Sequence, residues 1–135
     1  MHFVDTNVLL YSISPDASES HKRGIARSLL LEPDFALSVQ ILQEFYVQAT
    51  RLSRPGRLTH EQAVGLIMTW SRLPIQELTP AIVMRAIASS QRFQISYWDA
   101  AVLEAARTAG CATVLSEDLQ HGQDFDGVRV INPFL

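Results

Sequence analysis

Residues 2–7, His2-Phe3-Val4-Asp5-Thr6-Asn7, decide the fold because they join a short apolar run to an acid. A run of this kind predicts a buried strand, and residues 6–12 predict a short helix directly after it. Further apolar runs predict the other strands of the same sheet, at residues 35–38, 75–78, 112–115 and 128–131.

Helical segments separate these strands. Capping patterns predict a helix over residues 16–31 and helices that begin at about residues 59 and 96. A Thr-Pro pair predicts a helix from residue 80, and the spacing of apolar residues predicts one over 39–52. The alternation predicts a single α/β domain over residues 1–135. We expect a three-layer sandwich, with a mostly parallel five-stranded sheet and helices on both faces.

Composition limits the kind of protein. The chain has 135 residues, a net charge of −3 and one cysteine, Cys111, which excludes an internal disulfide and a multi-cysteine zinc site. No apolar run approaches the roughly 20 residues of a membrane span, and the N-terminus does not resemble a signal peptide, so we expect a cytoplasmic protein without a membrane partner. The cations are ten Arg and one Lys, a bias that favours contacts with phosphate despite the negative total.

Motifs exclude several common sites. The chain has no glycine-rich dinucleotide or P-loop motif and no Gly-x-Ser-x-Gly elbow, and its four histidines lack the spacing of metal ligands. Carboxylate chemistry remains. Asp5 and Asp118 each follow a predicted strand, so both should reach the edge of the sheet where parallel strands present ligands.

Each candidate acid also has a plain structural interpretation. Asp5 would cap the helix that follows it, and Asp99 would complete a capping box with Ser96. Asp118 would be a turn residue, and Glu44, which lies off the apolar stripe of its helix, would be a solvated charge.

Four segments, taken together, favour a functional interpretation. They are Asp5-Thr6-Asn7, the stretch from Ser38 to Glu44 and on through Phe45-Tyr46, Tyr97-Trp98-Asp99-Ala100, and Leu115-Ser116-Glu117-Asp118. In this order they resemble the PIN-domain family, and most of all the VapC-type toxins of bacterial and archaeal toxin–antitoxin modules. The resemblance covers the whole chain, including the closing residues 127–133.

The resemblance implies a site. The catalytic residues and the ligands of Mg²⁺, or of Mn²⁺, would be Asp5, Glu44, Asp99 and Asp118. The polar side chains that orient these acids would be Thr6, Asn7 and Ser116. Glu117 is not assigned as a ligand, and the acids of the 124–126 loop, Asp124 and Asp126, are expected to be turn residues.

The resemblance also implies an activity and partners. The protein would be an endoribonuclease that leaves 5′-phosphate and 3′-hydroxyl ends, acting as the toxin of a type II pair with a cognate antitoxin and as a homodimer. Two alternatives stay open: a non-catalytic module that captures a cation or basic peptide, and a structure-specific DNA nuclease of the same fold.

Two surfaces have two interpretations each. Three arginines surround the turn at residues 53–56: Arg51, Arg54 and Arg57. They could contact the phosphates of an RNA backbone, or they could belong to a solvated loop. The helix from residue 59 has an apolar stripe formed by Leu66, Ile67 and Trp70. This stripe, or Phe45 and Tyr46, could be core packing or a groove for a partner helix.

Overall fold

A computed structural model describes residues 1–135 and shows an α/β fold with one six-stranded sheet. The strands are β1 (His2–Val4), β2 (Phe35–Ser38), β3 (Ile75–Gln76), β4 (Thr113–Leu115), β5 (Asp124–Phe125) and β6 (Val128–Ile131). The helices are α1 (Thr6–Ser12), α2 (Ser20–Leu31), α3 (Val39–Thr50), α4 (His60–Trp70), α5 (Pro80–Phe93) and α6 (Tyr97–Thr108).

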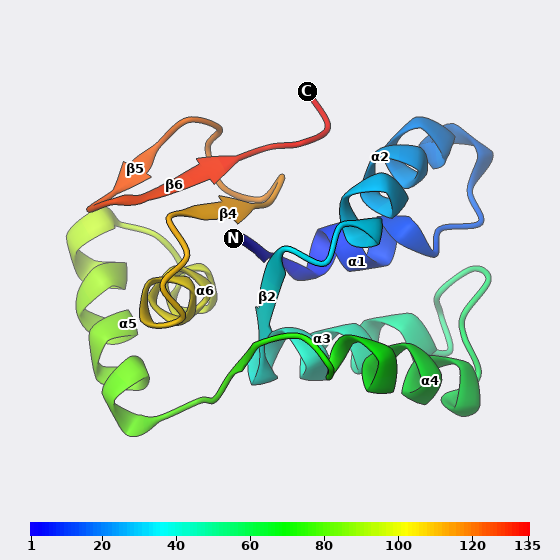
Figure 1. Cartoon of the computed structure of the whole chain (residues 1–135), viewed down its shortest axis with the longest axis horizontal. Helices are drawn as coiled ribbons and strands as arrows, with labels where there is room; N and C mark the ends of the chain where they lie inside the picture. Colours follow the sequence, from blue (N-terminus) through cyan, green and yellow to red (C-terminus); the bar gives the residue numbers. More distant parts are fainter.

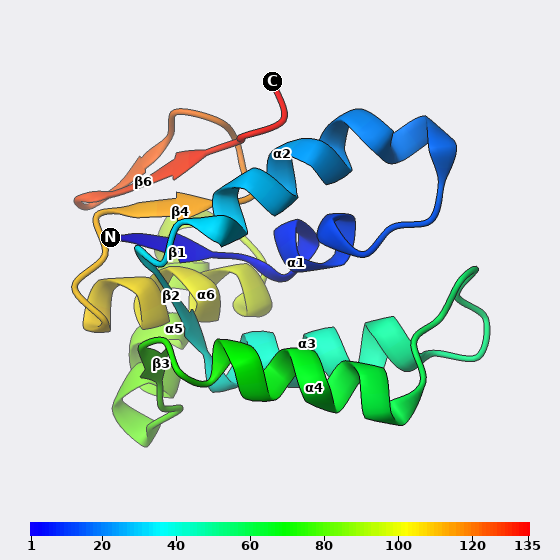
Figure 2. The same cartoon turned by 45° about the vertical axis from the view of Figure 1, so that its right-hand side comes forward.

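The sheet has the order β3-β2-β1-β4-β6-β5, and every pair except β5–β6 is parallel. Helix α6 lies across one face of the sheet with α5 outside it, and α2 lies on the opposite side (Figures 1 and 2). Helices α3 and α4 form a pair beyond β2 and β3. The predicted α/β class, parallel sheet and helices on both faces are therefore confirmed.

The structure differs from the prediction in one strand. Residues 124–127 form a hairpin with β6, in which Asp126 and Gly127 both have positive φ, 54° and 92°. Positive φ at both central residues is typical of the tight two-residue turn that Asp-Gly favours. Asp126 is therefore a turn residue, as predicted, whereas the same prediction for Asp124 is wrong because Asp124 lies in β5.

A second difference concerns the start of α2. Asp16 accepts hydrogen bonds from the backbone and hydroxyl of Ser18, whereas Glu19 accepts one from Ser14. The predicted capping box is therefore wrong: a 3-10 turn occupies Ala17–Glu19, and the α-helix begins only at Ser20.

The apolar stripe of α4 belongs to the core. Trp70 is buried and packs edge-to-face on the fully buried ring of Phe45, with centroids 4.7 Å apart, and Leu66 and Ile67 pack against the same cluster. The core interpretation is therefore confirmed for Trp70, whereas Leu66 and Ile67 pack against the core and stay partly exposed. No helix of the structure combines the length and the apolar character needed to span a membrane.

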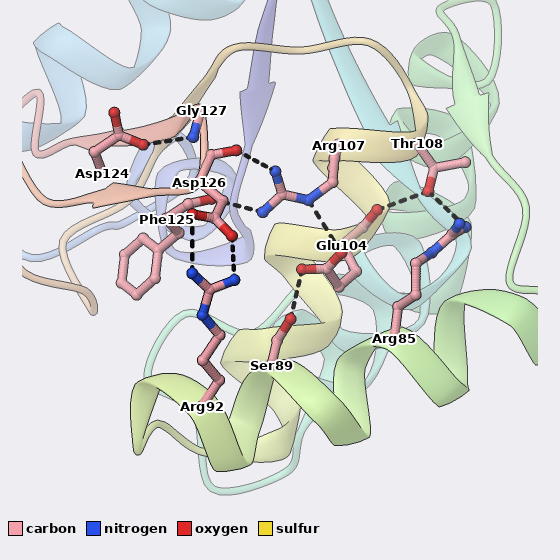
Figure 3. Close-up of polar contacts among 10 residues, drawn as sticks. All are labelled: Arg85, Ser89, Arg92, Glu104, Arg107, Thr108, Asp124, Phe125, Asp126 and Gly127. Carbon is pink, nitrogen blue, oxygen red and sulfur yellow. Dashed lines mark hydrogen bonds and ion pairs between the residues drawn. The ribbon is translucent and has the colours of Figure 1, made fainter.

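An ion-pair network fastens the hairpin to α5 and α6 (Figure 3). The carboxylate of Glu104 is buried, accepts a bond from Ser89, and lies 3.1 Å from Nε of Arg107. The guanidinium of Arg107 also donates to the carbonyl oxygens of Phe125 and Asp126, at 2.6 Å each. One arginine therefore neutralises a buried acid and holds the hairpin.

Replacement of this arginine should destabilise the protein strongly. Arg107→Met leaves the buried Glu104 carboxylate without its cation, so we expect a loss of about 2–4 kcal/mol in the free energy of unfolding, measured by urea denaturation. The matched control is Arg92→Met, which removes an exposed pair with Asp126 and should cost about 1 kcal/mol or less. Equal losses in the two variants would contradict this assignment.

Candidate active site

The end of β1 places Asp5 at the carboxyl edge of the sheet. Val4 pairs with Leu115 of β4, so the next residues, Asp5 and Ser116, lie opposite each other. The Asp5 amide donates to the Leu115 carbonyl at 3.0 Å, and Ser116 Oγ donates to Asp5 Oδ2 at 2.7 Å. Asp5 also caps α1 by accepting the Thr6 amide at 2.8 Å. The capping interpretation and the site interpretation are thus both compatible with its position.

Asn7 connects the two strand ends. Its Nδ2 amide donates to Ser116 Oγ at 3.1 Å and to Asp118 Oδ2 at 3.2 Å, and lies 3.4 Å from Asp5 Oδ2. The Asp118 amide in turn donates to Ser116 Oγ at 3.1 Å. The side-chain amide of Asn7 and the hydroxyl of Ser116 therefore each contact both Asp5 and Asp118.

Glu44 reaches the same edge from α3. Its Oε2 accepts the Thr6 hydroxyl at 2.7 Å, and its Oε1 accepts Nε2 of Gln40, one helical turn earlier, at 2.8 Å. The side chain is half-buried, so its interpretation as a solvated charge is wrong. Its position off the apolar stripe is what turns it away from the core and toward α1.

Asp99 lies in the first turn of α6. The Ser96 hydroxyl accepts the Asp99 amide at 3.1 Å, but the reciprocal bond of a capping box is absent. The residue is half-buried and its side chain contributes to the wall of the same pocket.

One pocket of about 490 Å³ contains all four candidate acids. It is lined by Asp5, Thr6, Gln40, Gln43, Glu44, Gln48, Trp98, Asp99, Val102 and Asp118. A larger groove of about 790 Å³ lies between α2 and the sheet, but it holds none of these four acids. The four carboxylates therefore lie in the 490 Å³ pocket, which we call the acid pocket.

The donor set of this pocket fits a hard divalent cation. No three of its acids form a ready-made metal cluster in the structure. Mg²⁺ does not need one, since it keeps several waters and is usually held by one or two carboxylates together with substrate phosphate. Four carboxylates in the lining of one pocket meet that requirement, and the lining contains no histidine or cysteine.

Burial and repulsion change the acidity of two of these groups. Burial raises the pKa of Asp5 to about 7, and the charges of Asp118 and Glu44 add to this effect, while the bond from Ser116 opposes it. Partial burial also raises the pKa of Asp99, again with contributions from Asp118 and Glu44. A cation in the pocket would relieve the same repulsion.

Glu117 points away from this pocket. Its carboxylate binds Nζ of Lys22 at 3.0 Å and accepts the hydroxyl of Tyr11. It lines a smaller pocket of about 210 Å³ together with Asn7 and Arg54. Its ion pair explains why Glu117, adjacent to Asp118 in sequence, is not placed with the four acids.

The arginine segment is only partly connected to the site. Arg54 is half-buried and lines the 210 Å³ pocket together with Asn7, whereas Arg51 and Arg57 are exposed. The turn lies against the segment that follows α1, where a Cβ atom on Gly56 would be 2.5 Å from the ring of Pro15. One of the three predicted phosphate-binding residues therefore shares a pocket with Asn7, but none of the three lines the acid pocket.

Sequence reasoning missed several residues of the pocket. Gln40 binds Glu44 and also lies 3.4 Å from the Trp98 carbonyl oxygen, so it connects α3 to α6. Its i, i+4 spacing from Glu44 was a usable signal. No comparable signal marks Gln43, Gln48 and the side chain of Trp98, which the tertiary fold brings to the pocket.

Because burial raises the pKa of Asp5, Asp5→Asn should be more stable than wild type, by an amount that depends on pH. Because the folded pKa is raised, the folded protein binds more protons than the unfolded chain between about pH 4 and 7, so stability falls as the pH rises through this range. We expect the metal-free variant to exceed wild type by roughly 2–4 kcal/mol at pH 8, and by much less at pH 4.5. Urea denaturation in chelator tests this; a constant difference at the two pH values would contradict it.

Several solved structures are similar to this chain in fold. VapC20 from Mycobacterium tuberculosis, described as a Sarcin-Ricin loop cleaving toxin, has a TM-score of 0.68 and 22% identity, over 87% of this chain and 92% of that one. A toxin–antitoxin complex from Klebsiella pneumoniae gives 0.71 and 22%, over 98% of both chains. FitAcB from Neisseria gonorrhoeae gives 0.65 and 23%, over 99% of both.

At these identities the solved structures establish a shared fold. No curated protein matches the sequence. The family model described as PIN domain matches residues 2–124, which include all four acids of the pocket and both strands that position them. The chain therefore belongs to the PIN domain family.

Proposed function

We propose that this protein is a metal-dependent endoribonuclease that hydrolyses RNA phosphodiester bonds as the toxin of a type II toxin–antitoxin pair. One observation carries the proposal: Asp5, Glu44, Asp99 and Asp118, far apart in sequence, line a single pocket at the carboxyl edge of the sheet. A site with four acids and no neighbouring cation has no evident use in packing, and its repulsion costs stability.

The four acids would hold Mg²⁺ or Mn²⁺, which supplies an activated water for attack on phosphorus and stabilises charge on the leaving oxygen. Ser116 and Asn7 fix the carboxylates of Asp5 and Asp118 through the hydrogen bonds described above. Thr6 and Gln40 hold the two oxygens of Glu44. Asp5, Glu44 and Asp118 are therefore oriented before substrate arrives, which reduces the reorganisation needed during the reaction.

Fold similarity supports the toxin assignment. The similar structures from K. pneumoniae and M. tuberculosis are described as a toxin–antitoxin complex and a cleaving toxin. We extend the proposal to a cytoplasmic protein that binds a cognate antitoxin and pairs with a second copy. Exposed apolar side chains on α5, Met84 and Ile87, support a protein contact on that helix.

Cleavage of labelled RNA tests the activity. Wild type with Mg²⁺ or Mn²⁺ should cut single-stranded RNA, and chelator should stop it. Asp99→Asn should lower the rate by about 100-fold or more, because the change removes a charge from the cation-binding wall. Glu117→Gln is the matched control, since its carboxylate binds Lys22 outside the pocket, and it should keep most of the activity.

The alternatives give different results in the same assay. Preferential cutting of a DNA oligonucleotide of the same sequence would favour a DNA nuclease. Divalent metal that raises the melting temperature without any cleavage would favour a binding module. Activity that survives in Asp99→Asn at the wild-type rate would contradict the proposed site.

The arginine segment predicts a salt-dependent affinity. If Arg51, Arg54 and Arg57 contact phosphates, replacing all three with Gln should weaken RNA binding and flatten the plot of log affinity against log salt concentration by about 0.7 per lost contact. Fluorescence anisotropy at several salt concentrations measures this slope. An unchanged slope would assign the segment to a solvated loop.

A further inference from the structure

Trp98 is the one aromatic residue in the wall of the acid pocket. Its side chain keeps 64% of its surface exposed, whereas the other tryptophan, Trp70, is buried in the core at 6%. Single exposed apolar residues are common on protein surfaces, and Met68, Met84 and Leu52 are examples here. None of those three borders the acids, so Trp98 differs from them in its location.

The fold holds Trp98 firmly at this place. It precedes Asp99 directly, so the two Cα atoms are about 3.8 Å apart. Its carbonyl oxygen lies 3.4 Å from the Gln40 amide that also binds Glu44, and its ring packs edge-to-face on Tyr97 at 5.1 Å. The backbone of Trp98 therefore contacts the side chain that orients Glu44, and its indole packs on the neighbouring ring of Tyr97.

Neutral amides form the adjoining wall. Gln43 and Gln48 line the pocket from α3, and neither has a side-chain hydrogen-bond partner in the structure. An amide offers a donor and an acceptor without charge, which suits the edge of a nucleobase better than a phosphate. The pocket thus has an acidic part suited to a cation and a phosphate, and a neutral part with one exposed aromatic face.

We propose that Trp98 is a base-stacking platform that makes the site selective for an unpaired nucleotide beside the scissile phosphate. This inference rests on the proposed nuclease function and names the form of its substrate. A base inside a duplex is already stacked and cannot cover the indole, whereas an unpaired base can do so whatever its identity. Gln43 and Gln48 would then contact the base edge.

Binding of fluorescein-labelled RNA, measured by anisotropy in the Asp5→Asn background with Mg²⁺, tests the stacking without cleavage. Trp98→Ala should raise Kd for single-stranded RNA by about 10- to 100-fold, and Trp98→Phe should restore most of the affinity. Met68→Ala, equally exposed but on α4, is the matched control and should have no effect. An oligonucleotide in which each base is removed in turn should show one position at which Trp98→Ala no longer matters.

The outcomes separate the two proposals. Wild-type RNA binding and cleavage in Trp98→Ala would overturn the stacking inference and leave the nuclease intact. An equal loss of affinity for duplex, abasic and intact single strands would also overturn it. If Trp98→Ala instead converts a dimer to a monomer in light scattering while Kd is unchanged, the indole is a protein contact and the inference is wrong. Failure of wild type to bind or cut any RNA would refute the nuclease proposal itself.

Discussion

The hydrogen bond between Ser116 and Asp5 is the contact on which the site depends. It joins the ends of β1 and β4, which are adjacent in the sheet but separated by more than a hundred residues in the chain. The parallel register that pairs Val4 with Leu115 places these two residues opposite each other. Asn7 then extends the connection to Asp118, so a property of the sheet backbone fixes the position of two carboxylates.

This arrangement has an energetic cost that points to a ligand. Burial and neighbouring acids raise the pKa of Asp5 to about 7, so ionising the group near neutral pH costs stability unless a cation compensates the charge. The rest of the structure supplies stability that offsets this cost at the carboxyl edge of the sheet. Alternating strands and helices bury a continuous core, and the Glu104–Arg107 pair fixes the distal hairpin on the far side of α6.

The sequence predicted much of the fold because the relevant signals are local. The apolar runs at β1, β2, β4 and β6 and the Thr59-x-x-Gln62 capping box appear as expected, and that box is complete in α4. The two-residue strand β5 was missed because Phe125 is the single apolar residue in its segment, although its Asp-Gly turn was visible. The Asp16 pattern failed because Glu19 bonds Ser14 instead of its own helix start.

The site was predictable only in part. Asp5 and Asp118 follow strands, so topology alone brings them to one edge, but Glu44 was selected by family resemblance. Its bonds to Thr6 and Gln40 supply the physical reason afterwards. Trp98, Gln43 and Gln48 have no signature in sequence, since their importance comes from a pocket that forms only where the fold brings α3 and α6 to the ends of β1 and β4.

Calorimetric titration of Mn²⁺ into the folded protein tests the central claim most directly, that these carboxylates hold a divalent cation together. We predict saturable binding that weakens by tenfold or more in Asp118→Asn and is unchanged in Glu117→Gln, whose acid is adjacent in sequence but paired with Lys22. Equal affinities in wild type and Asp118→Asn, or an equal loss in both variants, would contradict the account.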